Sequence, residues 1–88
     1  MYYRHNREVA CRRVEDEYVL VHPRAGEILV LDEVGARIWE LCGEQPMSPT
    51  ALGRRLAQEF AVGERRAARD ASAFLEELKS ADCVEALP

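Results

Sequence analysis

The segment from Gly26 to Leu41 constrains the fold most, because it changes from a strand pattern to a helix pattern within a few residues. Its first half holds consecutive apolar residues, Ile28–Leu31, after a turn that contains proline and glycine, which is typical of a short β-strand. Its second half places apolar residues at helical spacing, at Val34, Ile38 and Leu41. Between the halves stands Asp32, whose carboxylate can accept hydrogen bonds from the free N–H groups of a first helical turn. The segment therefore predicts a strand that passes directly into a helix.

Two further strands are predicted before this segment, over Val9–Val14 and Tyr18–Val21. The acidic residues 15–17 provide a turn between them, and residues 22–26 close a hairpin with the help of a proline and a glycine. In a simple meander the third strand, Ile28–Leu31, lies at an edge of the sheet, and it has no charge, proline or glycine that would block pairing. We therefore expect an open edge that can accept a strand from another chain.

Three helices are predicted after the strands. The first ends at Gly43, and the second starts at Ser48-Pro49, where serine caps the free N–H groups and proline needs no hydrogen bond. The third runs from about Glu64 to Ser80. We assign its buried face to Ala67, Ala71, Phe74, Leu75 and Leu78. The first half of this helix carries small side chains, which permits either close contact with another helix of the domain or the approach of another group.

The chain is expected to form a single domain over residues 1–88, with residues 1–6 as a flexible tail. Hydrophobic residues make up 48% of the sequence and charged residues 32%, a balance that is ordinary for a folded globular protein. No apolar run reaches the roughly 18 residues that a membrane helix needs, and residues 1–6 lack the apolar core of a signal peptide. We therefore expect a cytoplasmic protein without a membrane segment.

Catalytic, metal-binding and cofactor-binding patterns are absent from the sequence. There is no glycine-rich phosphate loop, and the histidines lie in the predicted tail and turn, at His5 and His22. The cysteines, Cys11, Cys42 and Cys83, are odd in number and too far apart for a disulfide framework or a zinc site, so we expect buried or half-buried thiols. No catalytic residue, metal or cofactor is therefore predicted.

The charge distribution leaves two other functions open. The net charge is −4, and only residues 47–70 are basic, with five arginines against three acidic residues. A winged-helix DNA-binding regulator would use the arginines of the third helix, which are Arg65, Arg66 and Arg69. The acidic residues of the same helix oppose nucleic-acid binding, and they are Glu64, Asp70, Glu76 and Glu77. A plain protein-interaction module is the other alternative, in which the open strand edge forms a homodimer by strand exchange.

The order of these elements resembles the PqqD-like family, whose members are also called RiPP recognition elements (RiPP, ribosomally synthesised and post-translationally modified peptide). The residues that carry the resemblance are the strand-to-helix segment 26–32, the helix segment 36–41, Ser48 with the stripe Leu52, Leu56 and Phe60, and the later pieces Arg69-Asp70 and 74–78. The resemblance as a whole covers roughly Val9 to Val84. The chain departs from the family at Asp32, where asparagine is usual, and at Asp82, where glycine is usual.

The resemblance implies an α+β, winged-helix-like domain, with a three-stranded antiparallel sheet followed by a three-helix bundle and with no chemistry of its own. Such domains bind the leader segment of a ribosomally made precursor peptide in natural-product biosynthesis. They deliver it to a modifying enzyme, often a radical-SAM enzyme, or in other pathways to a cyclase, a dehydratase or a leader protease. The leader adds as an extra strand along the third strand, with side chains directed toward the last helix. The peptide-binding residues that this implies are Glu27, Ile28, Leu29, Val30 and Leu31 on the strand and Arg66, Arg69, Asp70, Ala73, Phe74 and Glu77 on the helix.

A purely structural role is the alternative for most of these residues. The apolar side chains that can instead belong to the core are Leu29, Leu31 and Phe74. The charged side chains that remain solvated unless a partner desolvates them are Arg66, Arg69 and Glu77. Asp70, a single acid among alanines, can either stabilise neighbouring backbone or take part in binding.

Overall fold

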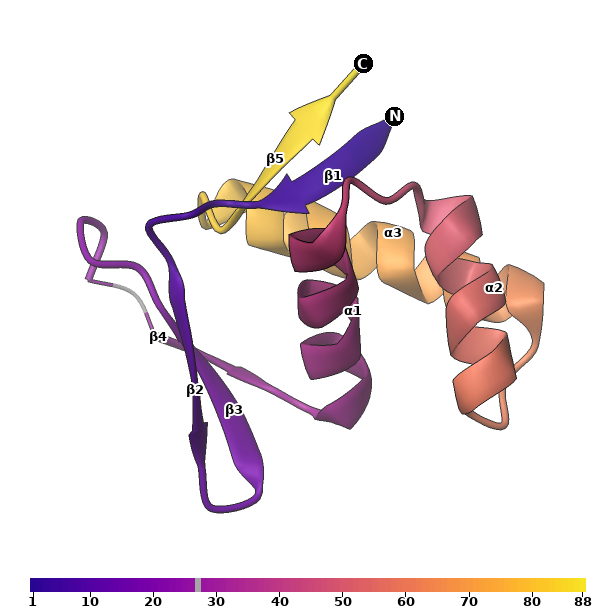
Figure 1. The fold of residues 1–88 in the computed structure, drawn as a ribbon, viewed down its shortest axis with the longest axis horizontal. Helices are drawn as coiled ribbons and strands as arrows, with labels where there is room; N and C mark the ends of the chain where they lie inside the picture. The colour runs from indigo at the N-terminus through magenta and orange to yellow at the C-terminus, as the bar shows by residue number, and fades with distance from the viewer. Residues whose placement is uncertain (27) are drawn as a thin grey trace.

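The computed structural model describes residues 1–26 and 28–88, which form an α+β fold (Figure 1). The elements in chain order are β1 (Tyr2–His5), β2 (Ala10–Val14), β3 (Glu17–Val21), β4 (Ile28–Leu31), α1 (Glu33–Glu44), α2 (Pro49–Glu59), α3 (Glu64–Ser80) and β5 (Val84–Leu87). The predicted three-stranded antiparallel sheet followed by three helices is confirmed. A second sheet, which pairs β1 with β5, is added to it.

β4 lies at one end of the three-stranded sheet, whose strand order is β2-β3-β4. The register pairs Leu20 with Leu29 and Val19 with Val30. Because side chains alternate along a strand, Leu20 and Leu29 share the face that packs into the core, while Val30 is on the other face and is 60% exposed. The prediction that this strand forms an edge of the sheet is confirmed.

The predicted flexible tail over residues 1–6 is wrong, because this segment contains β1. Its backbone pairs with β5 on one side, where Tyr3 stands opposite Ala86. On the other side Tyr3 and Met47 exchange two backbone hydrogen bonds, each of 2.8 Å. Tyr3 is buried as a result. A backbone that is paired on both sides and anchored by a buried ring is part of the folded domain.

The predicted helix starts follow from capping chemistry and are confirmed. The Asp32 carboxylate accepts from Gly35 N–H at 2.7 Å at the start of α1, and the Ser48 hydroxyl accepts from Ala51 N–H at 3.1 Å at the start of α2. α3 has the predicted bounds. It ends in a Schellman motif, in which Cys83 N–H donates to Leu78 C=O and Asp82 N–H donates to Lys79 C=O.

The small side chains in the first half of α3 allow close contact with α2. A Cβ atom placed on Gly53 of α2 would lie only 2.7 Å from the Cβ atom of Ala68. Ala67 and Ala71, which are also on α3, are buried. Of the two alternatives for this lean stretch, close packing within the domain is therefore confirmed.

The thiols divide between core and surface. Cys42 and Cys83 are buried, but the expectation of a buried or half-buried thiol is wrong for Cys11, which is exposed. Cys11 belongs to β2, the other edge strand, in which every residue is exposed.

In the described part of the chain, none of the helices has the length and apolar character needed to cross a membrane.

Candidate functional site

The outer edge of β4 is the most distinctive unpaired surface of the domain. Within residues 1–26 and 28–88, β4 pairs with β3 on one side and with no strand on the other. Ile28 and Val30 are 65% and 60% exposed, Leu29 is half-buried and Leu31 is buried. Unpaired N–H and C=O groups along such an edge are free to bond an extended segment. The geometry of this edge is therefore compatible with the addition of a strand.

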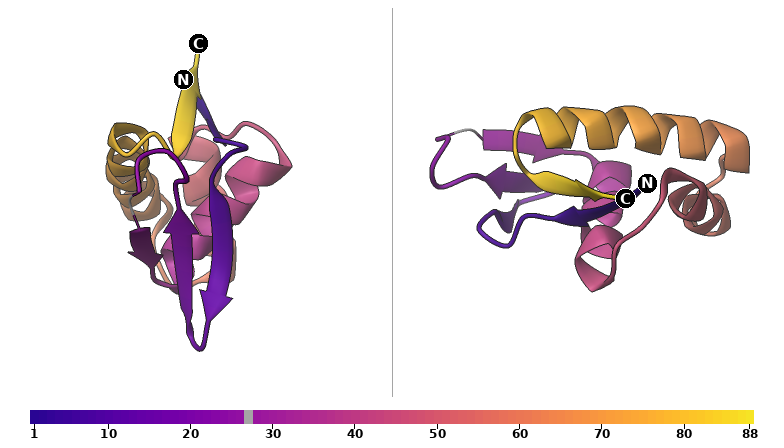
Figure 2. Two further views of the ribbon diagram at one scale, coloured as in Figure 1. Left: turned by 90° about the vertical axis from the view of Figure 1, so that its left-hand side faces the viewer. Right: turned by 90° about the horizontal axis from the view of Figure 1, so that it is seen from above.

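α3 lies next to this edge. Both views in Figure 2 show β4 as the strand of the three-stranded sheet that is nearest to α3. Helical spacing of 3.6 residues per turn places several predicted site residues on one stripe of α3, beside its buried face: Arg66, Asp70, Ala73, Phe74 and Glu77. All of them are exposed except Phe74, which is half-buried.

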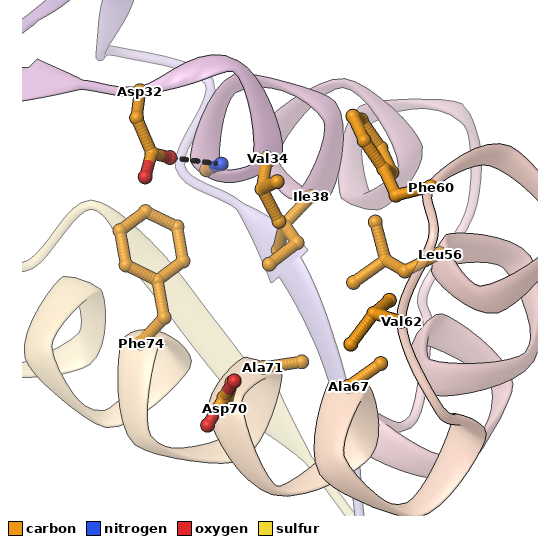
Figure 3. A pocket seen from close by; sticks show the side chains of 11 residues that line it. Asp32, Val34, Ile38, Leu56, Phe60, Val62, Ala67, Asp70, Ala71 and Phe74 are labelled. Atoms are coloured by element: carbon orange, nitrogen blue, oxygen red, sulfur yellow. Dashed lines mark hydrogen bonds between the residues drawn. The ribbon is translucent and has the colours of Figure 1, made fainter.

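A cavity of about 310 Å³ lies where the end of β4 meets the helices (Figure 3). Its lining comes from α1, α2, α3 and the connections around them. The lining residues are Asp32, Val34, Gly35, Ile38, Leu56, Phe60, Val62, Ala67, Asp70, Ala71 and Phe74. Apolar side chains dominate this set, and carboxylates enter it only at two positions, Asp32 and Asp70. Such a cavity suits an apolar side chain with a donor or a cation beside it.

Phe74 connects the cavity to the junction between β4 and α1. A Cβ atom on Gly35 would lie 3.1 Å from Phe74 Cζ and 3.1 Å from Asp32 Oδ1. The ring therefore packs directly on the first turn of α1, and Figure 3 shows it pointing at Asp32. Phe74 is half-buried and packs against the core while it also borders the cavity. Its core role and a binding role are compatible.

The structure brings together some of the predicted site residues and separates others. Asp70 and Phe74 meet at the cavity. Arg66 lies 3.9 Å from Asp70 in an ion pair that is largely solvated. Arg69 is about 100° around the helix from Asp70 and shares the face of Glu76, whose carboxylate accepts from the Tyr3 hydroxyl at 3.4 Å. Glu27 lies outside the described residues.

Sequence reasoning missed the contribution of α1 and α2 to the cavity. It placed the apolar side chains Leu56 and Phe60 in a core stripe, but both also line the cavity. The available signal was the run of small side chains in the first half of α3, where Ala68 packs closely on Gly53 while Ala67 and Ala71 also line the cavity. Sequence alone does not say on which side of α3 that space opens.

The three-stranded antiparallel sheet followed by three helices gives this chain an α+β, winged-helix-like fold. The chain belongs to the PqqD family, because the family model for coenzyme PQQ synthesis protein D (PqqD) matches residues 17–84. This match covers β3, β4, all three helices and the start of β5. No match was found among curated protein sequences.

Two solved structures resemble the chain over nearly its whole length. One is TbiB1 in complex with the TbiA(beta) leader peptide, with a TM-score of 0.83, 29% identity and coverage of 97% of this chain and 98% of that chain. The other is lasso peptide synthetase B1 complexed with the leader peptide, with a TM-score of 0.81, 27% identity and coverage of 98% of each chain. Each of them is thus a complex with a leader peptide.

Proposed function

We propose that this chain is a non-catalytic recognition domain that binds the leader segment of a ribosomally synthesised precursor peptide and presents it to a modifying enzyme. The mode of binding is β-strand addition to β4. The observation that supports this most is the unpaired β4 edge beside α3, in a chain that resembles two complexes with leader peptides. The modifying enzyme, such as a radical-SAM enzyme, supplies the chemistry.

Main-chain hydrogen bonds would attach the leader without reading its sequence. In an antiparallel pair, successive residues direct their N–H and C=O groups alternately toward one neighbour and toward the other. Because β4 is bonded to β3 on one side, alternate residues direct both groups at the open side: either Ile28 and Val30 or Leu29 and Leu31. The leader backbone attaches at one of these two pairs.

Side chains of α3 and the cavity would supply selectivity. An added strand points alternate side chains toward the helix side of the sheet, where Asp70 and Phe74 border the cavity. The residues proposed to bind the leader are Glu27, Ile28, Leu29, Val30, Leu31, Arg66, Arg69, Asp70, Ala73, Phe74 and Glu77. Among them, Phe74 is the apolar contact that the geometry favours most, because it stands between β4 and the cavity.

An amide chemical-shift titration of the labelled protein tests the proposal. The probe is a synthetic leader encoded by the short open reading frame nearest to the gene for this chain. We expect saturable shifts along Ile28–Leu31 and on the stripe of α3 that carries Phe74. Phe74→Ala should weaken binding about tenfold, equivalent to about 1.4 kcal/mol. Tyr2→Ala is the control, because Tyr2 is also an aromatic side chain, half of it is exposed, and it lies on β1.

Other outcomes would point to other functions. A response of Arg65, Arg66 and Arg69 to duplex DNA, with β4 silent toward the leader, would refute the proposal in favour of a DNA-binding regulator. Shifts at β4 that depend on protein concentration and need no peptide would show that a second copy occupies the edge by strand exchange. If Phe74→Ala and Tyr2→Ala lowered the affinity for the leader equally, the α3 stripe would not be part of the binding surface.

A further inference from the structure

A polar cluster outside the cavity joins the turn before β4 to the end of α3. The imidazole of His22, between β3 and β4, has only 4% of its side chain exposed, and its Nε2 lies 3.2 Å from Oδ2 of Asp82. The side-chain amide of Asn6 donates to the Asp82 C=O at 2.9 Å, and the Asn6 N–H donates to the Cys83 C=O at 2.8 Å. Three segments that are far apart in the sequence therefore meet at one point.

The hydrogen bonds of His22 define which ring nitrogen carries the proton. Nδ1 accepts from Arg24 N–H at 3.2 Å and from Ala25 N–H at 3.1 Å. The proton of the neutral ring is therefore on Nε2, which donates it to the Asp82 carboxylate. The His22 C=O also accepts from the N–H of Gly26, whose φ is 68°. His22 thus organises the turn that precedes β4 through both its ring and its backbone.

Asp82 is held in an unusual backbone conformation in which its carboxylate meets this ring. Its φ is 57°, a left-handed value that raises the conformational energy of a residue other than glycine. It occupies the position after the α3 cap in the Schellman motif. The ion pair between Arg24 of this turn and Glu8, which precedes β2, differs because both side chains are exposed, and such pairs contribute little to stability. In the pair of His22 and Asp82 the carboxylate is also exposed, but the imidazole is buried.

We propose that the hydrogen bond between His22 and Asp82 holds the beginning of β4 at a fixed separation from α3. This inference rests on the proposed function, because that separation sets the width of the surface that a leader strand would occupy. A leader on β4 has to meet the side chains of α3 at the same time, so a fixed separation lowers the conformational cost of binding. His22 and Asp82 are positioning residues in this scheme and do not contact the leader.

Asp82→Gly separates the role of the carboxylate from that of the backbone. Glycine adopts a φ near 57° without strain, so the end of α3 is kept while His22 loses its acceptor. We expect the affinity for the synthetic leader, measured by calorimetry, to fall roughly fivefold. In the free protein, amide exchange of Ala25 and of β4 should accelerate. Asp82→Asn keeps an oxygen acceptor and tolerates the left-handed region, so it should behave like the wild type in both measurements.

Glu15→Gly is the matched control, because Glu15 has the same φ of 57° but lies in the turn between β2 and β3 (Figure 1). It should change neither the affinity nor the exchange of β4. The inference is overturned if Asp82→Gly leaves the exchange of Ala25 and β4 at the wild-type rate, or if it weakens leader binding no more than Glu15→Gly does. A wild-type protein that binds no leader would refute the proposed function instead, and exchange in the free protein would still decide on the positioning role.

Discussion

Substitution of Gly53 by alanine tests how closely α2 and α3 approach each other. A Cβ atom on Gly53 would lie 2.7 Å from Ala68 Cβ and 2.8 Å from both Ala68 N and Glu64 O. Carbon atoms pack best at about 3.5–4.0 Å, so the helices would have to separate by roughly 1 Å. Two of these three neighbours are backbone atoms, which cannot rotate away. Overpacking of this kind costs about 1–3 kcal/mol, and the better helix propensity of alanine recovers about 1 kcal/mol.

We expect Gly53→Ala to lower the free energy of unfolding by about 2 kcal/mol, from the upper end of the overpacking range less the gain in propensity. For a small domain this corresponds to a fall of roughly 8–16 °C in Tm, measured by circular dichroism. Gly63→Ser is the control, because no heavy atom lies within 4 Å of a Cβ atom at Gly63 and serine improves the cap of α3. If Gly53→Ala melted at or above the wild-type temperature, helix propensity would dominate and the close approach of α2 to α3 would be wrong.

Two further predictions concern ionisable side chains. A hydrogen bond from Arg37 lowers the pKa of Glu59, so the pair stabilises the fold above the ordinary carboxyl range and this contribution is lost as the pH falls through the lowered pKa. Arg37→Gln should therefore lower the Tm more near neutral pH than in acid, where Glu59 becomes protonated; an equal effect at both would show that ionisation of Glu59 is irrelevant. Burial raises the pKa of the Cys42 thiol to about 11, and Cys83 is also buried. A thiol reagent should therefore label Cys11 in the native protein and the other two only on unfolding, and rapid native labelling of a second thiol would contradict their burial.

Elements with local chemical signals are predictable from this sequence. The caps at Asp32 and Ser48 act on N–H groups only three residues away, so the residues that decide them are neighbours in the chain. The bounds of α3 also match the prediction, although its N-cap residue, Gly63, makes no side-chain hydrogen bond. The edge position of β4 follows from the order of three strand-forming runs joined by short turns, which leaves little choice of pairing.

Features that depend on distant partners are not predictable in this way. β1 forms because Tyr2 and Tyr3 pair with Leu87 and Ala86 at the other end of the chain. No sequence pattern within residues 1–6 indicates that β5 is the pairing partner. The bond between His22 and Asp82 joins residues 60 positions apart. The cavity depends on how far the helices separate at Phe74 while they pack tightly elsewhere, a property of tertiary spacing that side-chain volumes alone do not define.

The antiparallel pairing of β1 with β5 also brings the two ends of the described chain side by side, as Figure 1 shows. A longer polypeptide that carried this domain as an insertion would enter and leave it through adjacent points. Neither connection would need to cross β4, because that strand belongs to the other sheet. The same proximity permits a circular permutant, in which a short linker closes the original ends and new ends are opened at the exposed turn between β2 and β3. The topology thus allows the domain to be carried within a larger chain with its open edge uncovered.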